Sequence, residues 1–244
     1  MTIPVPESTS RRTVPVRVSL PVSPRSRTEQ GDRGTRTREA VLTAALGLYA
    51  AEGYGAVTMR GIANRLGFSA PAIYNYFLSK EEIFSTLQDI GLDLMASTVL
   101  TPETDAPLAD FRSIFANYYA FCGEHPAYFS LLYVDPAAPH VPPTTPALLR
   151  MTEETNRRFS RCLESRVFPD DTPVHVPGLF WALVHGLAVL RRVSVMPPGP
   201  EVDMQMTVGL DLLVAGLQAG LLPAHAYQLF KPTRPSLLNT RTPR

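Results

Sequence analysis

The chain has 244 residues, of which 45% are apolar, and a formal net charge of +1. This length can bury a sizeable core, and no apolar run of about 18 residues predicts a membrane span. Pro15, Pro21 and Pro24 leave no apolar segment for a signal peptide. Cys122 and Cys162 do not form the pattern of a disulfide framework, so we expect a cytoplasmic protein with reduced thiols.

The charges are unevenly distributed along the chain. Residues 1–38 hold eight Arg against three acidic residues, and residues 231–244 hold four basic residues and no acidic one. The residues between these ends are acidic overall. Basic ends on an acidic body indicate contact with a polyanion, although solvated basic tails give the same pattern.

Order is expected to begin after the N-terminal region. Residues 1–34 are rich in Pro, Ser, Thr and Arg without sustained periodicity, which predicts a disordered basic arm. From Thr35 or Thr37 onward, apolar residues recur at helical spacing, and Gly53 ends this helix.

Two short helices are expected next, one over residues 58–66 and one from Ser69. A long linker helix over residues 79–97 follows, because Ser79 and Glu82 form a capping box in which Glu82 would reach back to the N-cap amide. Together these elements predict one domain over residues 35–97.

Helical periodicity continues beyond residue 98. It is interrupted at Pro126, at the Pro-rich residues 135–146 and at residues 196–200, and no alternating pattern of convincing length predicts a strand. The predicted fold class is therefore all-α, with a second domain over residues 98–222 and a basic C-terminal tail over residues 223–244.

The two short helices separated by Gly67 are typical of a helix-turn-helix, whose second helix enters the major groove of DNA. The hydroxyl groups of Tyr74 and Tyr76 can reach phosphates, and Lys80 begins a helix whose free amides can also meet a phosphate. Serine and amide side chains can hydrogen-bond to bases, and small apolar side chains suit a thymine methyl group. The predicted base-reading residues are Ser69, Ala70, Pro71, Ala72 and Asn75.

The segment TMRGIANRLGFSAPAIYNYFLSKEEIF resembles the DNA-binding domain of TetR/AcrR-family transcriptional regulators, over about residues 37–84. The resemblance implies that Thr58 and Arg60 contact DNA phosphates. It also implies that Tyr74, Tyr76 and Lys80 contact the DNA backbone. Alternatively, Tyr74 and Phe77 only hold this helix against the first one. The motif residues are Thr58, Ile62, Ala63, Gly67, Ser69, Ile73, Tyr74, Phe77, Ser79, Lys80 and Glu81.

Two residues depart from the family pattern. Tyr76 stands where the family often has His, and Pro71 replaces a commonly small residue. Tyr76 keeps the ability to form hydrogen bonds but has no titratable imidazole. Both departures leave the sequence of the operator open, but they do not change the assignment to the family.

The resemblance also implies that residues 98–222 bind a ligand and form a dimer. FWALVHGLAVLRR resembles the Trp-His-Gly signature of one C-terminal subtype of the family, with Trp181 and His185 on one helix face. These side chains either line a pocket or lie in an ordinary core. The same two readings apply to the other pocket candidates, Phe111, Phe115, Tyr118, Tyr119, Cys122, Phe129 and Met151, and a pocket of this kind would suit an apolar or aromatic effector.

Other chemistry has little support in the sequence. Cys122 and His125 have a metal-ligand spacing but no matching second pair. No Ser/His/Asp order, Gly-rich phosphate loop or paired carboxylates stands out. We therefore predict that the protein is not an enzyme and has no metal and no cofactor.

The predicted function is that of a homodimeric repressor, which a small-molecule effector releases from a pseudo-palindromic operator in double-stranded DNA. The apolar residues 206–222 are expected to dimerise; the alternative is a helix buried within its own subunit. The arm would add non-specific contacts to the DNA backbone or the minor groove through Arg25, Arg27, Arg33, Arg36 and Arg38. The rival functions are a regulator that activates or answers to a protein, and a helical enzyme with a vestigial DNA-binding domain.

Overall fold

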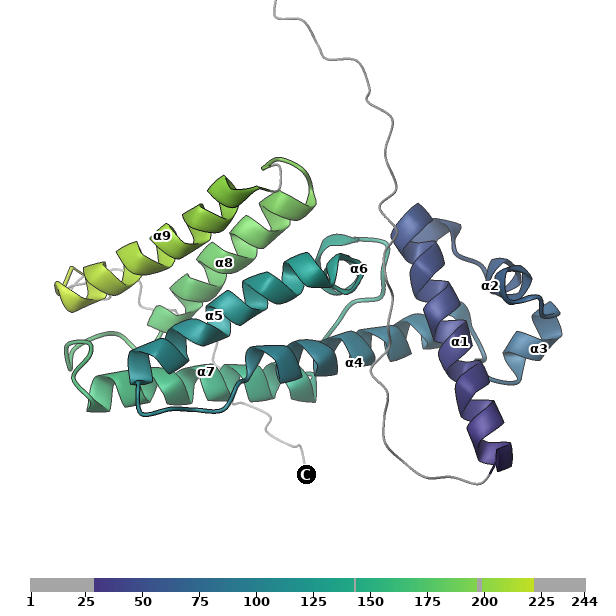
Figure 1. Ribbon diagram of the computed structural model, residues 1–244, viewed down its shortest axis with the longest axis horizontal. Helices are drawn as coiled ribbons and strands as arrows, with labels where there is room; N and C mark the ends of the chain where they lie inside the picture. Colours follow the sequence, from purple (N-terminus) through teal and green to yellow (C-terminus); the bar gives the residue numbers. More distant parts are fainter. Residues whose placement is uncertain (1–28, 143, 197–198, 222–244) are drawn as a thin grey trace, which may run out of the picture. The chain divides into compact units, whose positions relative to one another are not determined.

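A computed structural model describes residues 29–142, 144–196 and 199–221 (Figure 1). Most of the predicted arm and the whole predicted tail over residues 223–244 lie outside these residues. Throughout the described part, all regular structure is helical, which confirms the all-α prediction. None of the helices in this part is long and apolar enough to cross a membrane.

The chain divides into two compact units. Of the described residues, the first unit holds those up to Ala96 together with Glu124–Ala147, and the second holds Ser97–Gly123 together with those from Leu148 onward. The first of these divisions falls at residue 97, and residues 124–147 group with the first unit. The sequence-based domains over residues 35–97 and 98–222 remain predictions.

The first unit begins with a long helix, α1 (Glu29–Glu52), followed by a 3-10 turn, η1 (Tyr54–Ala56). α1 starts ahead of the predicted Thr35, so residues 29–34 are helical rather than part of an irregular arm. Next come α2 (Met59–Leu66), α3 (Ala70–Tyr74) and α4 (Lys80–Val99). α2 packs on α1 and α3 packs on α2 (Figure 1).

The start of α4 shows why this helix begins where it does. The Ser79 hydroxyl accepts a hydrogen bond from the Glu82 amide at 3.2 Å, as a capping box requires. The Glu82 carboxylate accepts from the Leu78 amide at 2.6 Å, which is one residue before the N-cap amide that the sequence predicted. The capping pair therefore also fixes the turn between α3 and α4.

Residues 124–147 contain α6 (Pro126–Phe129) and a π-helical turn, η2 (Ser130–Val134), and they pack on α4. A Cβ atom added to Gly91 of α4 would lie 2.7 Å from the Tyr128 ring, so glycine permits this close approach. The buried Gln88 side chain donates to the carbonyl oxygen of Pro139 at 2.6 Å. A glycine and an amide on one helix thus hold the segment in the first unit.

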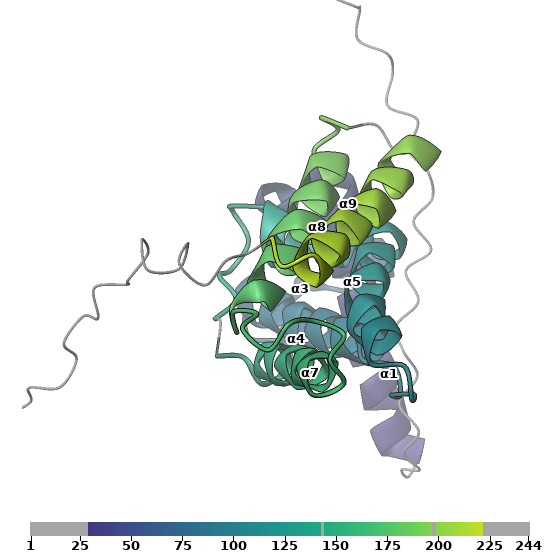
Figure 2. The same cartoon turned by 90° about the vertical axis from the view of Figure 1, so that its left-hand side faces the viewer.

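The second unit is built from α5 (Pro107–Glu124), α7 (Pro146–Glu164), α8 (Val176–Arg192) and α9 (Pro200–Gln218). Its core is aromatic: the Phe111 ring lies 5.1 Å from Phe115, 5.5 Å from Phe159 and 5.0 Å from Phe180. α8 and α9 lie side by side (Figure 2). A Cβ atom at Gly209 would lie 2.8 Å from the Leu183 side chain, so this small residue serves packing within the chain.

A buried polar cluster joins α7 to the segment before α5. The Arg158 side chain is 1% exposed and donates to Glu154 Oε1 and to the Asp110 carbonyl oxygen, both at 3.0 Å, and to the Thr101 carbonyl oxygen. Arg161 donates to the Asp110 carboxylate at 2.9 Å. Although burial opposes it, hydrogen bonds from Thr104 and Arg161 hold the pKa of Asp110 below its ordinary value.

Candidate DNA-binding surface and candidate effector site

The helix-turn-helix is set by local backbone chemistry. Thr58 caps α2, because its Oγ1 accepts a hydrogen bond from the Gly61 amide at 3.0 Å. Gly67 ends α2 with a φ of 69°, the left-handed conformation that favours glycine. Ser69 then begins α3 with extended backbone, and Pro71 stands in its first turn, where a missing amide hydrogen costs little.

The predicted DNA-contacting residues differ in exposure. Ile73 and Phe77 are buried and anchor α3, so the alternative role suggested for Phe77 fits its 1% exposure, whereas Tyr74 is 50% exposed. The exposed members of the predicted set are Thr58, Arg60, Ser69, Pro71, Tyr74 and Asn75. The half-buried members are Ala70, Ala72, Tyr76 and Lys80.

The ammonium group of Lys80 contacts η1. Its Nζ donates to the Tyr54 carbonyl oxygen at 2.5 Å and lies 3.8 Å from the centre of the Tyr54 ring. This ring packs edge-on against Phe84, with centroids 4.8 Å apart, and the Tyr54 hydroxyl lies 3.4 Å from Glu81 Oε1. The sequence analysis did not identify Tyr54 as a partner of Lys80. The sequence feature that could have drawn attention to Tyr54 is its position between two glycines, directly ahead of the helix-turn-helix.

Arg38 makes a similar contact just beyond the C-terminal end of α3. Its Nη1 donates to the Tyr76 carbonyl oxygen at 2.7 Å, and its guanidinium carbon lies 3.9 Å from the centre of the Phe77 ring. The sequence analysis counted Arg38 among the DNA-contacting residues of the arm. Arg25 and Arg27 lie outside the described residues.

The structure brings most of the predicted pocket residues together. Tyr118 Oη lies 2.7 Å from His185 Nδ1, and the Trp181 ring lies 5.0 Å from Tyr118 and 5.2 Å from Phe115. Phe111, Tyr119, Cys122 and Met151 are buried in the same unit. Phe129 is also buried and is grouped with the first unit.

Burial governs the protonation of this group. Desolvation lowers the pKa of His185 and raises the pKa of Cys122 to about 12, so at neutral pH the imidazole and the thiol are both uncharged. The Tyr118 hydroxyl and His185 Nδ1 can share this hydrogen bond in either tautomer of the neutral ring. Arg191, which sequence reasoning also missed, adds a cation: its guanidinium lies 5.4 Å from the Tyr119 ring centre and pairs with Asp203 at 3.2 Å.

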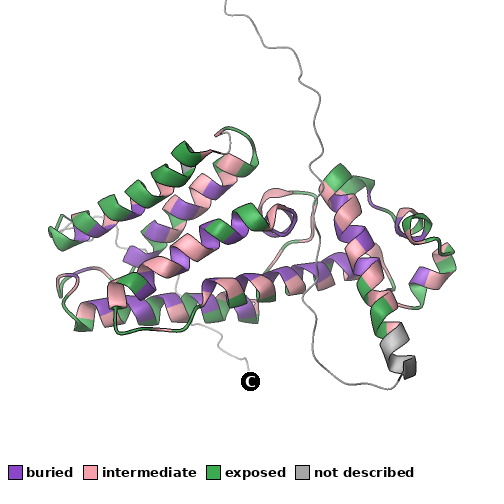
Figure 3. Cartoon of the chain, in the orientation of Figure 1, coloured by how far each residue is buried: buried purple, intermediate pink, exposed green. Residues whose placement is uncertain are grey.

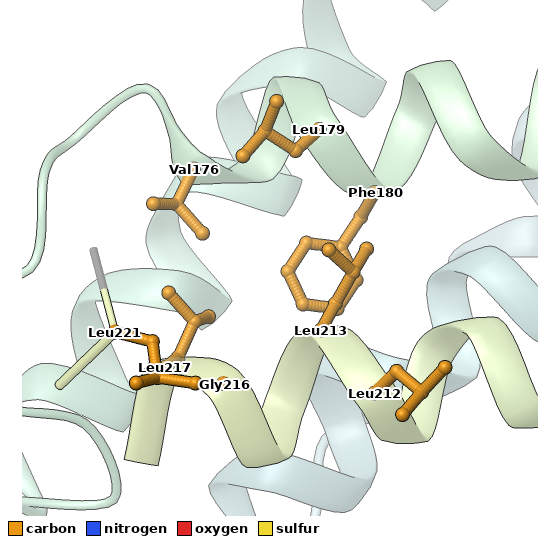
Figure 4. A pocket seen from close by; sticks show the side chains of 8 residues that line it. All are labelled: Val176, Leu179, Phe180, Leu212, Leu213, Gly216, Leu217 and Leu221. Atoms are coloured by element: carbon orange, nitrogen blue, oxygen red, sulfur yellow. The ribbon is translucent and has the colours of Figure 1, made fainter. Parts of the chain in front are cut away.

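A small apolar hollow lies between α8 and α9, and none of the predicted pocket residues lines it (Figure 4). Its volume is ≈ 160 Å³. Its lining residues are all apolar, and they are Val176, Leu179, Phe180, Leu212, Leu213, Gly216, Leu217 and Leu221. Leu212, which lines the hollow, is 68% exposed. Much of α9 is exposed (Figure 3).

The predicted absence of a metal site remains a prediction. In the part of the chain that the structure describes, no three His, Cys, Asp or Glu side chains form a group that could hold an ion. Cys122 and Cys162 are free thiols.

The fold and the site define a helix-turn-helix domain joined to a second helical domain. Residues 41–87 match the tetR family of bacterial regulatory proteins, and residues 111–213 match the tetracyclin repressor-like C-terminal domain. The chain therefore carries both domains of a TetR-family regulator. The matches do not confirm the Trp-His-Gly subtype, and a comparison with curated protein sequences gives no match.

Several solved structures share this fold. PfmR, a TetR-family regulator from Thermus thermophilus, has 20% identity and a TM-score of 0.53, with 72% of this chain and 98% of that chain covered. The ketosteroid regulator KstR2 of Mycobacterium tuberculosis has 20% identity and a TM-score of 0.53 (75% and 95% covered). The fatty acid degradation regulator FadR of Bacillus halodurans has 14% identity and a TM-score of 0.54 (75% and 96% covered).

Proposed function

We propose that the protein is a homodimeric repressor that binds a pseudo-palindromic DNA operator in the cytoplasm and leaves it when an apolar or aromatic effector binds. The surface of α3 carries this proposal. Ile73 and Phe77 anchor the helix, while Ser69, Pro71 and Asn75 are exposed on it or at its ends. Small and hydrogen-bonding side chains in this position suit entry into a major groove.

Each predicted contact has a role in this proposal. Thr58 accepts the amide hydrogen of Gly61 but keeps its own hydroxyl proton, which can go to a phosphate oxygen. Arg60 and Tyr74 are exposed and would also bind the DNA backbone. Tyr76 and Lys80, which are half-buried, would bind it as well. Asn75 and Ser69 would bind base edges, and Pro71 and the two alanines of α3 would approach thymine methyl groups.

Dimerisation would occur through α8 and α9. Met204, Val208 and Leu212 recur every four residues along α9 and are exposed, as are Leu179 and Leu190 of α8. Exposed apolar patches of this kind mark interaction sites. A two-fold contact between copies would present two α3 helices to half-sites about one DNA turn apart.

An effector would bind in the second unit and favour a dimer that no longer fits its operator. The aromatic group around Trp181 and His185 and the apolar hollow beside Phe180 both suit an apolar molecule. The names of two regulators of the same fold refer to ketosteroids and to fatty acid degradation. Ketosteroids and fatty acids are both largely apolar molecules.

The first test is a titration of the purified protein against DNA upstream of its own gene, at two salt concentrations, with a scrambled duplex as the control. We expect the upstream DNA to bind at least about 10³-fold more tightly and a footprint with two-fold symmetry. Asn75→Ala should weaken this binding by about 1–3 kcal/mol without lowering the melting temperature. Equal affinity for the two duplexes would count against the proposal.

A further inference from the structure

The apolar hollow between α8 and α9 has the size and the chemistry of a site for one apolar side chain. Val176 and Phe180 of α8 lie across it from Leu213 and Leu217 of α9 (Figure 4). Its volume is ≈ 160 Å³, and an apolar cavity of about 150 Å³ can hold one benzene ring. No polar side chain lines the hollow, so a polar group placed inside it would lack a side-chain partner.

The chain reaches this hollow where α9 ends. The Gly220 amide donates to the Leu217 carbonyl oxygen at 3.0 Å, and the Leu221 amide donates to the Gly216 carbonyl oxygen at 2.9 Å. With a φ of 66° at Gly220, these bonds form a Schellman motif, which commonly brings the residue after the glycine back onto the last turn of the helix. Leu221 lines the hollow together with Gly216 but is still 71% exposed. The chain that follows therefore starts at the edge of the hollow.

The residues that come next suit an apolar site. Residues 222–230 lie outside the described residues; they read LPAHAYQLF and contain no Asp, Glu, Lys or Arg. The hollow follows α9 only from Leu212 to Leu221, about 14 Å, whereas an extended chain of about nine residues spans up to about 30 Å. Both Tyr227 and Phe230 are therefore within reach. A buried tyrosine hydroxyl needs a hydrogen-bond partner, so the lining favours Phe230.

We propose that residues 222–230 dock on the hollow of their own chain, with the ring of Phe230 inside it. Leu212 belongs both to the hollow and to the proposed dimer surface, whereas Met204 and Val208 of that surface do not line the hollow. The docked segment would therefore leave the part of α9 around Met204 and Val208 to a second copy. An apolar effector could enter the hollow only by displacing Phe230.

The first experiment measures how fast a cysteine beside Phe230 forms a disulfide with the rim of the hollow. Leu229→Cys and Leu179→Cys are combined in the full-length protein, and oxidation by glutathione disulfide is followed by non-reducing electrophoresis. Cys122 and Cys162 are buried and should not compete. The matched control also carries Phe230→Ala, which keeps the tether and removes only the ring. We expect an intrachain disulfide that forms about tenfold faster with the ring than without it.

The second experiment fills the hollow from α9. Gly216 lines the hollow, and a Cβ atom added there would have nothing within 4 Å, so Gly216→Leu should occupy the space and exclude the Phe230 ring. In the wild-type background, Phe230→Ala should raise the unfolding equilibrium constant about tenfold. In the Gly216→Leu background it should change this constant less than about twofold. Leu238→Ala, further along the tail, is the control and should change neither background. All variants are unfolded in urea at one protein concentration.

Other outcomes overturn the inference. Equal rates of disulfide formation with and without the ring would show that Phe230 does not hold the segment at the hollow. A disulfide between two chains would show that a second copy supplies the occupant. An equal loss from Phe230→Ala in both backgrounds would place the ring elsewhere. Neither experiment uses DNA or an effector, so its result does not depend on whether the proposed function holds.

Discussion

The two units use their cationic side chains in different ways. In the first unit, Arg38 and Lys80 are partly exposed and bind single carbonyl oxygens beside aromatic rings. In the second unit, Arg158 is fully buried and is surrounded by acceptors from three segments of the chain. A partly exposed cation can be removed with modest loss, whereas a buried one leaves several acceptors without a donor.

The largest expected effect tests the second unit. Arg158→Met should lower the free energy of unfolding by about 3–5 kcal/mol, because it leaves the carbonyl oxygens of Thr101 and Asp110 without this buried charged donor. Its neighbour Arg157 is exposed, so Arg157→Met should cost less than about 1 kcal/mol. Urea unfolding of both variants checks the difference, and equal losses would show that burial does not distinguish the two cations.

A smaller effect tests how residues 124–147 are held in the first unit. Gly91→Ala places a methyl group 2.7 Å from the Tyr128 ring and should cost about 1–3 kcal/mol despite the better helix propensity of alanine. Gly178 is the matched control, since it is exposed on α8 with nothing within 4 Å of an added Cβ atom. Thermal unfolding should show Gly178→Ala unchanged or stabilised; stabilisation of both variants would refute the close approach.

The smallest effect tests protonation in the second unit. Burial lowers the folded-state pKa of His185, so the unfolded chain binds a proton at a higher pH than the folded chain. Stability should therefore fall as the pH drops below about 6.5, by at most about 1.4 kcal/mol per pH unit, until the folded-state pKa is reached.

His185→Gln keeps an acceptor for the Tyr118 hydroxyl and should flatten this part of the pH profile. His140, which is exposed in a loop of the first unit, provides the control. Stability measured by urea unfolding between about pH 5 and pH 7.5 should show the flatter profile only in the His185 variant. An identical profile in the wild type and His185→Gln would contradict the predicted linkage.

Sequence reasoning succeeded where the physical signal is local. Gly67, Thr58 and the Ser79–Glu82 pair fix turns and caps through contacts within a few residues, so the helix-turn-helix could be located from the sequence. The capping partner of Glu82 was displaced by one residue because the turn at Leu78 brings a different amide within reach.

The sequence did not reveal features that depend on distant residues. Arg38 contacts Tyr76, and Gly91 contacts Tyr128, but the two residues of each pair are far apart in the chain. No sequence pattern around either residue predicts its partner. The predicted pocket residues illustrate the same limit, since helical spacing identifies an inward face but does not say whether it meets a hollow or other side chains. Helical periodicity shows that the residues lining the hollow between α8 and α9 are apolar, but it does not predict that a hollow lies between them.

The arrangement of α3 has an evolutionary consequence. Ile73 and Phe77 attach this short helix to the core, whereas Ser69, Pro71 and Asn75 face outward. Substitutions at the outward positions therefore leave the fold almost unchanged while altering the chemistry that would meet a base pair. After gene duplication, a copy of this protein could acquire a new operator through a few codon changes, and selection for folding would not oppose them.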